Sequence, residues 1–338
     1  MMFLLLFVLT TQGETTLPTW ITLQSGNRSS MRGLAVLNER VAWFGGSGGV
    51  WGRTTDGGKT WQSGRIASDQ LDFRDIHIID VQTALYMGAG EGKKSRIFRT
   101  EDGGKTWSPL FTNKWEKGFF NTLAFWDAEN GLLLSDPIDD RPFILITANG
   151  GKSWRRIPPD TFPPLREGEY GFAASGTCIA LAGKNHIWLA TGGSRARVFH
   201  SADRGKTWKD YDSPLKSGNP SSGIFSIAFR DARHGVIVGG NYREERGTGN
   251  TVAYTSDGGK TWVLAKNHQK VPFRSCVAPV PGKDKWWVAV GPSGSSLSKN
   301  DGKTWTSFPG GYHVLAFGDK AEAGLAAGRN GALGLLKW

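Results

Sequence analysis

Three arginines spread along the chain are the residues best suited to binding an anion. Arg32, Arg74 and Arg274 each stand near the start of a segment that has the character of a strand. Guanidinium groups hold carboxylates and phosphates through paired hydrogen bonds, so three together would form an anion site. The alternative is that each one pairs with a nearby carboxylate, such as Asp72 or Asp75.

A tyrosine and two glutamates could add glycosidase chemistry to an arginine cluster. Tyr312 is the candidate nucleophile, and Glu167 and Glu169 are the candidate acid/base residues. Against this alternative, the sequence shows no complete glycosidase constellation, no Gly-x-Ser-x-Gly elbow and no His/Cys/Asp cluster with metal-ligand spacing. We therefore favour binding over catalysis and predict no metal site.

An octapeptide that recurs six times indicates which elements must position these residues. Its copies read Thr/Ser-x-Asp/Asn-x-Gly-Lys-Thr/Ser-Trp and lie 43 to 54 residues apart, a spacing typical of repeat architectures. The third position is taken by Asp56, Asp102, Asn149, Asp203, Asp257 and Asn300. The closing position is taken by Trp61, Trp107, Trp154, Trp208, Trp262 and Trp305.

The octapeptide has the chemistry of a tight turn between two strands. The Asp or Asn side chain accepts backbone N–H bonds inside the turn, and glycine adopts positive φ at little cost. The first hydroxyl ties the turn to its own strand, and the tryptophan packs between neighbouring sheets. We interpret the motif as structural rather than calcium-binding or catalytic, because turn chemistry accounts for each of its residues.

Strand-like segments surround each octapeptide in a fixed order. In the second unit, 74–78 and 84–87 precede the strand 96–100 that enters the turn, and Trp107 opens a fourth strand. Four strands per unit, repeated around a ring, predict an all-β fold, the β-propeller.

The two ends of the chain set the number of blades. Three strand-like segments follow the last octapeptide without a fourth, whereas 19–23 resembles a fourth strand without three before it. We predict a single domain over 19–338, a seven-bladed β-propeller of four-stranded antiparallel blades whose last blade is closed by the N-terminal strand. Closure would hide the free edges of the sheets.

The first residues predict an exported protein. Residues 1–9 are all apolar, and Thr11 and Gly13 suit a cleavage site, which indicates a signal peptide over 1–13. The apolar run is too short for a membrane span, which needs about 20 residues. We expect a secreted or periplasmic protein without a transmembrane anchor.

The formal net charge of +11 favours an anionic partner. An acidic protein or peptide, an anionic polysaccharide or a membrane surface would fit. We expect no nucleic acid, because the basic residues are scattered among loops, and we expect a monomer. No Gly-x-Gly-x-x-Gly fingerprint follows a strand, so we expect no nicotinamide, flavin or other cofactor. Cys178 and Cys276 fall in blades that are not adjacent, so we expect two free thiols.

The octapeptide resembles the Asp-box, or BNR repeat, which also occurs in sialidases and other glycoside hydrolases. With phrases such as 71–76, 124–127, 172–177 and 223–229, it makes residues 19–338 similar to bacterial relatives of the photosystem II stability/assembly factor. This resemblance implies a non-catalytic propeller that binds another protein or peptide. The alternative is a glycoside hydrolase of the sialidase-like type, because the repeat does not choose between binding and catalysis.

The face opposite the octapeptides is the predicted binding face, because long loops lie there and long loops on one rim of a propeller usually carry function. In the predicted propeller, three arginines and a histidine are the first residues of the strands nearest the central channel and lie at its mouth. Charged loops contribute three more arginines, although the loop 243–246 could instead pair with itself in solvent. The predicted anion- or partner-binding residues are Arg32, Arg74, Arg274, His313, Arg166, Arg243 and Arg246.

Overall fold

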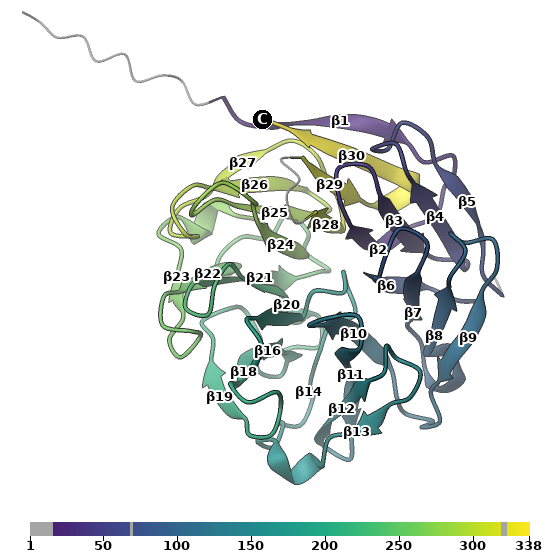
Figure 1. Ribbon diagram of the computed structural model, residues 1–338. Helices are drawn as coiled ribbons and strands as arrows, with labels where there is room; N and C mark the ends of the chain where they lie inside the picture. The colour runs from purple at the N-terminus through teal and green to yellow at the C-terminus, as the bar shows by residue number, and fades with distance from the viewer. Residues whose placement is uncertain (1–15, 68–69, 319–322) are drawn as a thin grey trace, which may run out of the picture.

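The chain forms a ring of seven antiparallel sheets around a central channel, as the computed structural model shows (Figure 1). The structure describes residues 16–67, 70–318 and 323–338, so the predicted signal peptide over 1–13 lies outside the described residues. Each sheet is one blade, and its strands succeed one another from the channel outward. The predicted seven-bladed propeller is confirmed.

The strands of the blades occupy four positions, counted outward from the channel, and the blades are numbered in chain order. The inner strands, from blade one to blade seven, are β2 (Met31–Val36), β6 (Phe73–Ile78), β10 (Phe120–Phe125), β15 (Ile179–Ala182), β20 (Ser222–Phe229), β24 (Cys276–Pro279) and β28 (Val314–Phe317). The second strands, in the same order, are β3 (Ala42–Gly46), β7 (Ala84–Gly88), β11 (Asn130–Ile138), β16 (His186–Ala190), β21 (Gly235–Asn241), β25 (Trp287–Gly291) and β29 (Gly324–Ala327). The third strands are β4 (Val50–Thr54), β8 (Arg96–Thr100), β12 (Arg141–Ala148), β18 (Arg197–Ser201), β22 (Val252–Thr255), β26 (Gly294–Ser298) and β30 (Ala332–Lys337). The outer strands are β5 (Gln62–Arg65), β9 (Ser108–Thr112), β13 (Arg155–Arg156), β19 (Lys209–Asp212), β23 (Val263–Leu264), β27 (Thr306–Phe308) and β1 (Thr19–Gln24).

A few short elements lie outside this scheme. Two strands, β14 (Glu169–Tyr170) and β17 (Gly192–Gly193), extend the sheet of blade five from its inner edge. Single 3₁₀ turns are η1 (Gly92–Lys94), η2 (Pro159–Thr161), η3 (His268–Lys270) and η4 (Arg329–Gly331). Across the described ranges, no helix has the length and apolar character that crossing a membrane requires.

The octapeptides connect third to outer strands, and we call the face that carries them the turn face. In the first octapeptide, Asp56 Oδ1 accepts the Thr60 N–H at 3.0 Å and its Oδ2 accepts the Thr60 hydroxyl at 2.6 Å. The Thr54 hydroxyl donates to Asp56 at 2.8 Å and accepts the Gly58 N–H at 2.9 Å. These bonds, led by that from the Thr60 hydroxyl, lower the pKa of Asp56 to about 2. The turn thus satisfies its own polar groups.

The second glycine of each octapeptide is fixed by both backbone and packing. All six of these glycines have φ between 77° and 92°. A Cβ on Gly104 would lie 2.4 Å from the Trp51 ring of the preceding blade. The first glycine is less restricted, because Arg204 and Asp301 hold its place in two octapeptides with φ of 60° and 58°.

The closing tryptophans join neighbouring blades. Trp107 of blade two contacts the Trp43 and Trp51 rings of blade one at centroid distances of 6.2 and 5.5 Å. Further around the ring, Trp208 and Trp305 are 7% and 4% exposed. Burial of these rings makes the contacts between blades a main source of stability.

The seventh blade combines the two ends of the described chain. Strand β1 pairs with β30 in an antiparallel register that runs from Thr19↔Lys337 to Gln24↔Ala332. Trp20 of β1 also donates its indole N–H to the Ser295 hydroxyl of blade six at 3.0 Å. The prediction that the N-terminal strand closes the last blade is therefore confirmed.

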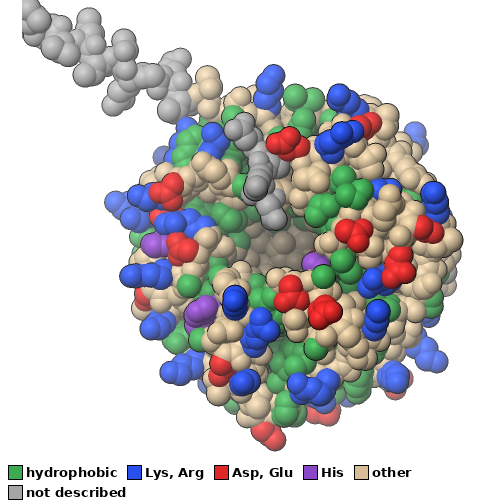
Figure 2. Space-filling model, in the orientation of Figure 1, with side chains coloured by type: hydrophobic (Ala, Val, Ile, Leu, Met, Phe, Trp, Pro, Cys, Tyr) green, Lys and Arg blue, Asp and Glu red, His purple; other side chains and the backbone are tan. Residues whose placement is uncertain are grey.

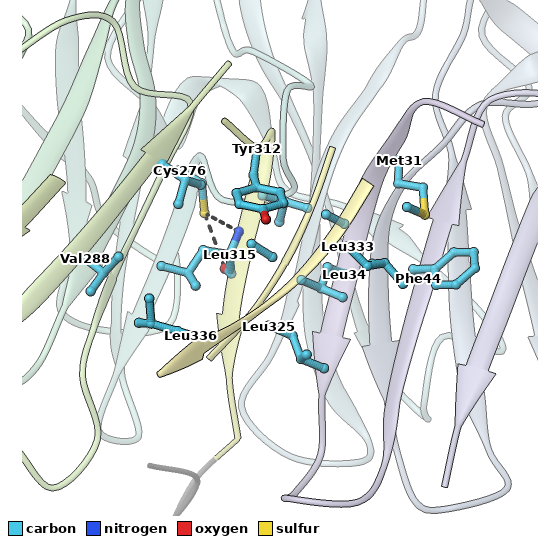
Figure 3. Packing of buried hydrophobic residues seen from close by; sticks show 14 of the residues in the cluster. Met31, Leu34, Phe44, Cys276, Val288, Tyr312, Leu315, Leu325, Leu333 and Leu336 are labelled. Carbon is cyan, nitrogen blue, oxygen red and sulfur yellow. Dashed lines mark hydrogen bonds between the residues drawn. The ribbon is translucent and has the colours of Figure 1, made fainter. Parts of the chain in front are cut away.

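Apolar side chains of blades six, seven and one pack in one cluster beside this closure (Figure 3). Within it the Cys276 thiol donates to the Leu315 carbonyl and accepts the Leu315 N–H, both at 3.4 Å. Cys178 and Cys276 are buried and unpaired, as expected. Burial raises the pKa of both thiols, which makes them inert core residues.

Candidate functional site

A cavity of about 430 Å³ opens at one mouth of the central channel, on the side we call the loop face. The loops of this face join outer to inner strands of successive blades and second to third strands within a blade. All seven blades contribute to the lining, which includes Arg32, Arg74, Phe119, Asn121, Asp136, Tyr170, Phe172, Phe225, Tyr242, Glu245, Phe273, Ser275, His313 and Arg329. This volume is in the range of ligand pockets.

Three arginines, Arg32, Arg74 and Arg329, form what we call the arginine side of the cavity. Burial and the charges of Arg74 and Arg329 lower the pKa of Arg32, and only Asp72 acts in the opposite direction. Arg74 Nε pairs with Asp72 at 2.8 Å, and its Nη1 donates to the Ala173 carbonyl at 2.9 Å. The guanidinium of Arg32 makes no hydrogen bond with any residue that the structure describes. Converging cations of this kind repel each other and favour an anion.

Of the predicted inner-strand residues, Arg32, Arg74 and His313 meet at the cavity. His313 is 3% exposed, and burial together with Arg32 and Arg329 lowers its pKa to about 3. The imidazole is therefore neutral at physiological pH and adds no positive charge. The alternative that each arginine pairs with a nearby carboxylate is confirmed for Arg74, which binds Asp72. Among the described residues, Asp75 binds no arginine and accepts hydrogen bonds from Thr122 and Leu123 at 2.9 and 2.8 Å.

Arg274 does not join the cluster. Its side chain is 1% exposed, and its guanidinium donates to the Ser296 hydroxyl at 2.9 Å and to the Phe273 carbonyl at 3.0 Å inside blade six. Burial lowers its pKa to about 10. The predicted triad is corrected accordingly: Arg329 of η4, which sequence reasoning missed, stands where Arg274 was expected.

Two of the residues that line the cavity, Asp136 and Glu245, carry a carboxyl group. Asp136 of β11 accepts a hydrogen bond from Asn121 Nδ2 at 2.9 Å. Burial raises its pKa to about 6, and the bond from Asn121 opposes that rise. A group that titrates near neutral pH within a cationic cavity can modulate the binding of an anion.

The three candidate glycosidase residues are not brought together at the cavity. Tyr312 is 7% exposed and packs against Trp20 at a centroid distance of 4.8 Å, inside the seam that closes the ring. Glu169 is 2% exposed and forms an ion pair with Arg197 at 2.6 Å. Glu167 is exposed on the adjoining loop and, like the other two, does not line the cavity.

The loop arginines Arg166, Arg243 and Arg246 are exposed and do not line the cavity themselves. The loop 243–246 is not self-paired: Glu244 binds Lys216 at 2.8 Å, and Glu245 forms an ion pair with Arg329 across the cavity mouth. Figure 2 shows one end of the channel as a central hollow with Lys and Arg side chains spread around it, and its view does not single out the cavity of the loop face. The described ranges contain no cluster of three or more His, Cys, Asp or Glu residues that could hold a metal ion.

No protein-family model matches the chain. Among curated proteins, it is 26% identical over 240 residues to the photosystem II assembly protein Ycf48 of Synechococcus sp. (strain JA-3-3Ab), which covers 70% of this chain and 62% of the relative. It is 25% identical over 254 residues to the photosystem II assembly lipoprotein Ycf48 of Synechococcus sp. (strain CC9902), covering 72% and 66%. A sialidase of Bacteroides fragilis is 24% identical over 235 residues, covering 67% of this chain but 39% of the enzyme.

Solved structures with the same fold give a second comparison. A structure of YCF48 bound to a D1 peptide matches with a TM-score of 0.67 and 16% identity, covering 94% of this chain and 96% of the other. YCF48 from Cyanidioschyzon merolae matches with a TM-score of 0.65 and 17% identity, covering 94% and 98%. This chain is a seven-bladed propeller that is similar in sequence and fold to the photosystem II assembly protein Ycf48. The fold alone does not decide function, since virginiamycin B lyase from Staphylococcus aureus matches with a TM-score of 0.68 and 10% identity, covering 95% and 99%.

Proposed function

We propose that this Ycf48-like propeller is a non-catalytic scaffold that binds an acidic segment of a protein or peptide in the cavity of the loop face. One observation carries the proposal. Arg32 is largely enclosed, stands beside two further arginines, and makes no hydrogen bond with the described residues. An acidic side chain or a terminal carboxylate would relieve this repulsion and take up bidentate bonds from the guanidinium groups.

The comparisons support a peptide as the ligand. A structural neighbour is described as bound to a D1 peptide, and curated relatives are named assembly proteins. We extend the proposal to an extracytoplasmic, monomeric protein, because one relative is named a lipoprotein and residues 1–13 have the pattern of a signal peptide. An anionic polysaccharide is the alternative ligand on grounds of charge alone.

The proposal is tested by calorimetric titration of the full chain with an acetylated peptide that carries two glutamates. We expect Arg32→Ala and Arg74→Ala each to weaken binding tenfold or more, and we expect affinity to fall as salt rises. Arg40→Ala is the matched control, because Arg40 lies at the other end of blade one, where it donates to the Thr55 carbonyl at 3.3 Å. Unchanged affinity in both cavity variants would place the binding surface elsewhere.

A glycosidase remains the alternative function because of the sialidase relative. A panel of fluorogenic glycosides tests it directly. We expect no turnover, because the candidate residues do not meet at the cavity. Turnover that is lost in Glu167→Gln or Tyr312→Phe would overturn the scaffold proposal.

A further inference from the structure

Five aromatic rings line the cavity opposite the arginine side. They make a continuous series in which Phe172 stacks on Phe225 at 3.9 Å, and Phe273 meets Phe225 edge-on at 4.8 Å. Tyr170 contacts Phe172 at 5.5 Å, and Tyr242 contacts Phe225 at 6.1 Å. We call these five residues the aromatic side of the cavity.

The aromatic side differs from the other apolar clusters of the molecule in where it lies. The other clusters each contain the inner, second and third strands of blades and hold the ring together. Here the rings come from loops and strand ends of blades four, five and six, and all of them line the cavity. Tyr242 is 43% exposed although it is a large aromatic residue. Phe172, Phe225 and Phe273 are 8%, 3% and 2% exposed, so a ligand would meet chiefly Tyr242 and half-buried Tyr170, which contact the buried phenylalanines.

Strand pairing fixes the backbone that carries Tyr170 and Phe225 before any ligand arrives. Strand β14, which contains Tyr170, pairs with β17, and β17 in turn pairs with β20 through Gly192 and Gly223. Glu169 anchors the same strand by its buried ion pair with Arg197. A preformed surface loses little conformational freedom on binding, which is the property of a recognition site.

The arginine and aromatic sides adjoin each other. Arg74 reaches from blade two to blade four, where it donates to the carbonyl of Ala173, the residue next to Phe172. Arg74 also lies over the Phe119 ring at 5.9 Å. A ligand whose acidic group meets the arginines therefore has its neighbouring groups directly over the aromatic rings.

We propose that the cavity recognises a peptide segment in which an acidic group is adjacent to a large aromatic side chain, with the ring seated on the aromatic side. This inference rests on the proposed function and defines its ligand more narrowly. Aromatic rings favour stacked or edge-on contact with other rings, and the positive neighbours exclude a basic segment. Charge alone would select any acidic peptide, whereas the aromatic side selects among acidic peptides.

Two acetylated tetrapeptides of equal charge test this inference with the full chain. Each peptide carries two glutamates, and the residue between the two glutamates is phenylalanine in one peptide and alanine in the other. We expect the phenylalanine peptide to bind at least tenfold more tightly to the unsubstituted protein. In Tyr242→Ala we expect this preference to shrink at least threefold, while the affinity for the alanine peptide stays the same.

Tyr211→Ala is the matched control, because Tyr211 lies on the outer strand β19 of blade four and does not line the cavity. Melting temperatures of both variants establish that they fold. Equal affinity for the two peptides would overturn the aromatic inference while leaving the acidic-peptide scaffold intact. A preference that is unchanged in both Tyr242→Ala and Tyr170→Ala would also overturn it. Binding of neither peptide would overturn the proposed function itself.

Discussion

The turn face and the loop face are built from the same seven blades, yet their side chains follow opposite rules. On the turn face, Asp56 and its counterparts accept bonds from hydroxyl and N–H groups of their own octapeptide. On the loop face the side chains at the channel differ in type around the ring, from arginine to asparagine, phenylalanine and histidine, and Arg32 stands without a hydrogen-bond partner among the described residues. Repetition with satisfied groups indicates stability, whereas variation with unsatisfied charge indicates recognition.

The largest effect is expected on the turn face, from Gly104→Ala. The new Cβ would need positive φ and would meet the buried Trp51 ring at 2.4 Å, so we expect a loss of about 3 kcal/mol in the free energy of unfolding. Chemical denaturation measures this loss. Gly57→Asn is the control, because asparagine tolerates positive φ and a Cβ there would approach only the Glu39 carbonyl, at 3.0 Å. Equal losses in the two variants would contradict the proposed role of packing between blades.

A smaller loss of stability is expected from Glu169→Gln, because Glu169 belongs to a buried ion pair that supports the loop face. The substitution removes the charge that Arg197 meets at 2.6 Å in a buried setting, at a cost of about 2 kcal/mol. Peptide affinity should also fall, because Glu169 and Tyr170 lie on the same short strand β14 and Tyr170 lines the cavity. Exposed Glu167 provides the control, since Glu167→Gln should change neither quantity. If Glu169→Gln kept both its stability and its peptide affinity, the ion pair would contribute to neither.

The pH dependence of binding tests Asp136. Burial raises its pKa to about 6, above the value of about 3.9 for a free Asp side chain, so its favourable contribution to folding is complete below about pH 4 and is lost as pH rises through 6. The new negative charge then also opposes an acidic ligand. We expect affinity for an acidic peptide to fall about threefold between pH 5 and 7, as measured by titration calorimetry. In Asp136→Asn this decrease should disappear, and its persistence would assign the titration to another group.

The smallest effect is expected for Glu245, whose carboxylate forms an ion pair with Arg329 at the cavity mouth. Glu245→Gln removes an internal carboxylate that competes with the ligand, so we expect affinity for an acidic peptide to rise about twofold. Glu244→Gln serves as the control, because Glu244 pairs with Lys216 instead. Weaker binding in Glu245→Gln would show that this ion pair supports the cavity rather than blocking it.

The fold could be predicted because its signal is local. The bonds that the Asp or Asn side chain of each octapeptide accepts lie within eight residues, so the spacing of the octapeptides gives the order of strands in six blades, and the strand-like segments at the two ends give the seventh. The direction of a side chain at the channel is not local in this sense. Arg32 lies within β2, whereas Arg274 precedes β24, and a shift of one residue at the start of a strand reverses the side to which a side chain points.

Arg329 and the aromatic side could be found only in part from the sequence. The loop between the second and third strands of blade seven belongs to the same face as the loop 243–246 of blade five, so Arg329 could have been placed there. The aromatic side depends on how β14, β17 and β20 pair, and two of these strands have only two residues each. Such short pairings leave no periodic pattern in the sequence.

The pairing of β1 with β30 also dictates the order of events in folding. Strand β1 must wait until β30 has been synthesised, because Thr19 pairs with Lys337. Blades one to six can each form from neighbouring segments as synthesis proceeds, but the ring closes only when β30 is present, at the expense of closing a very long loop. A chain that is cut short before β30 would leave β1 unpaired and the ring open, so the synthesis of β30 is itself the signal for ring closure.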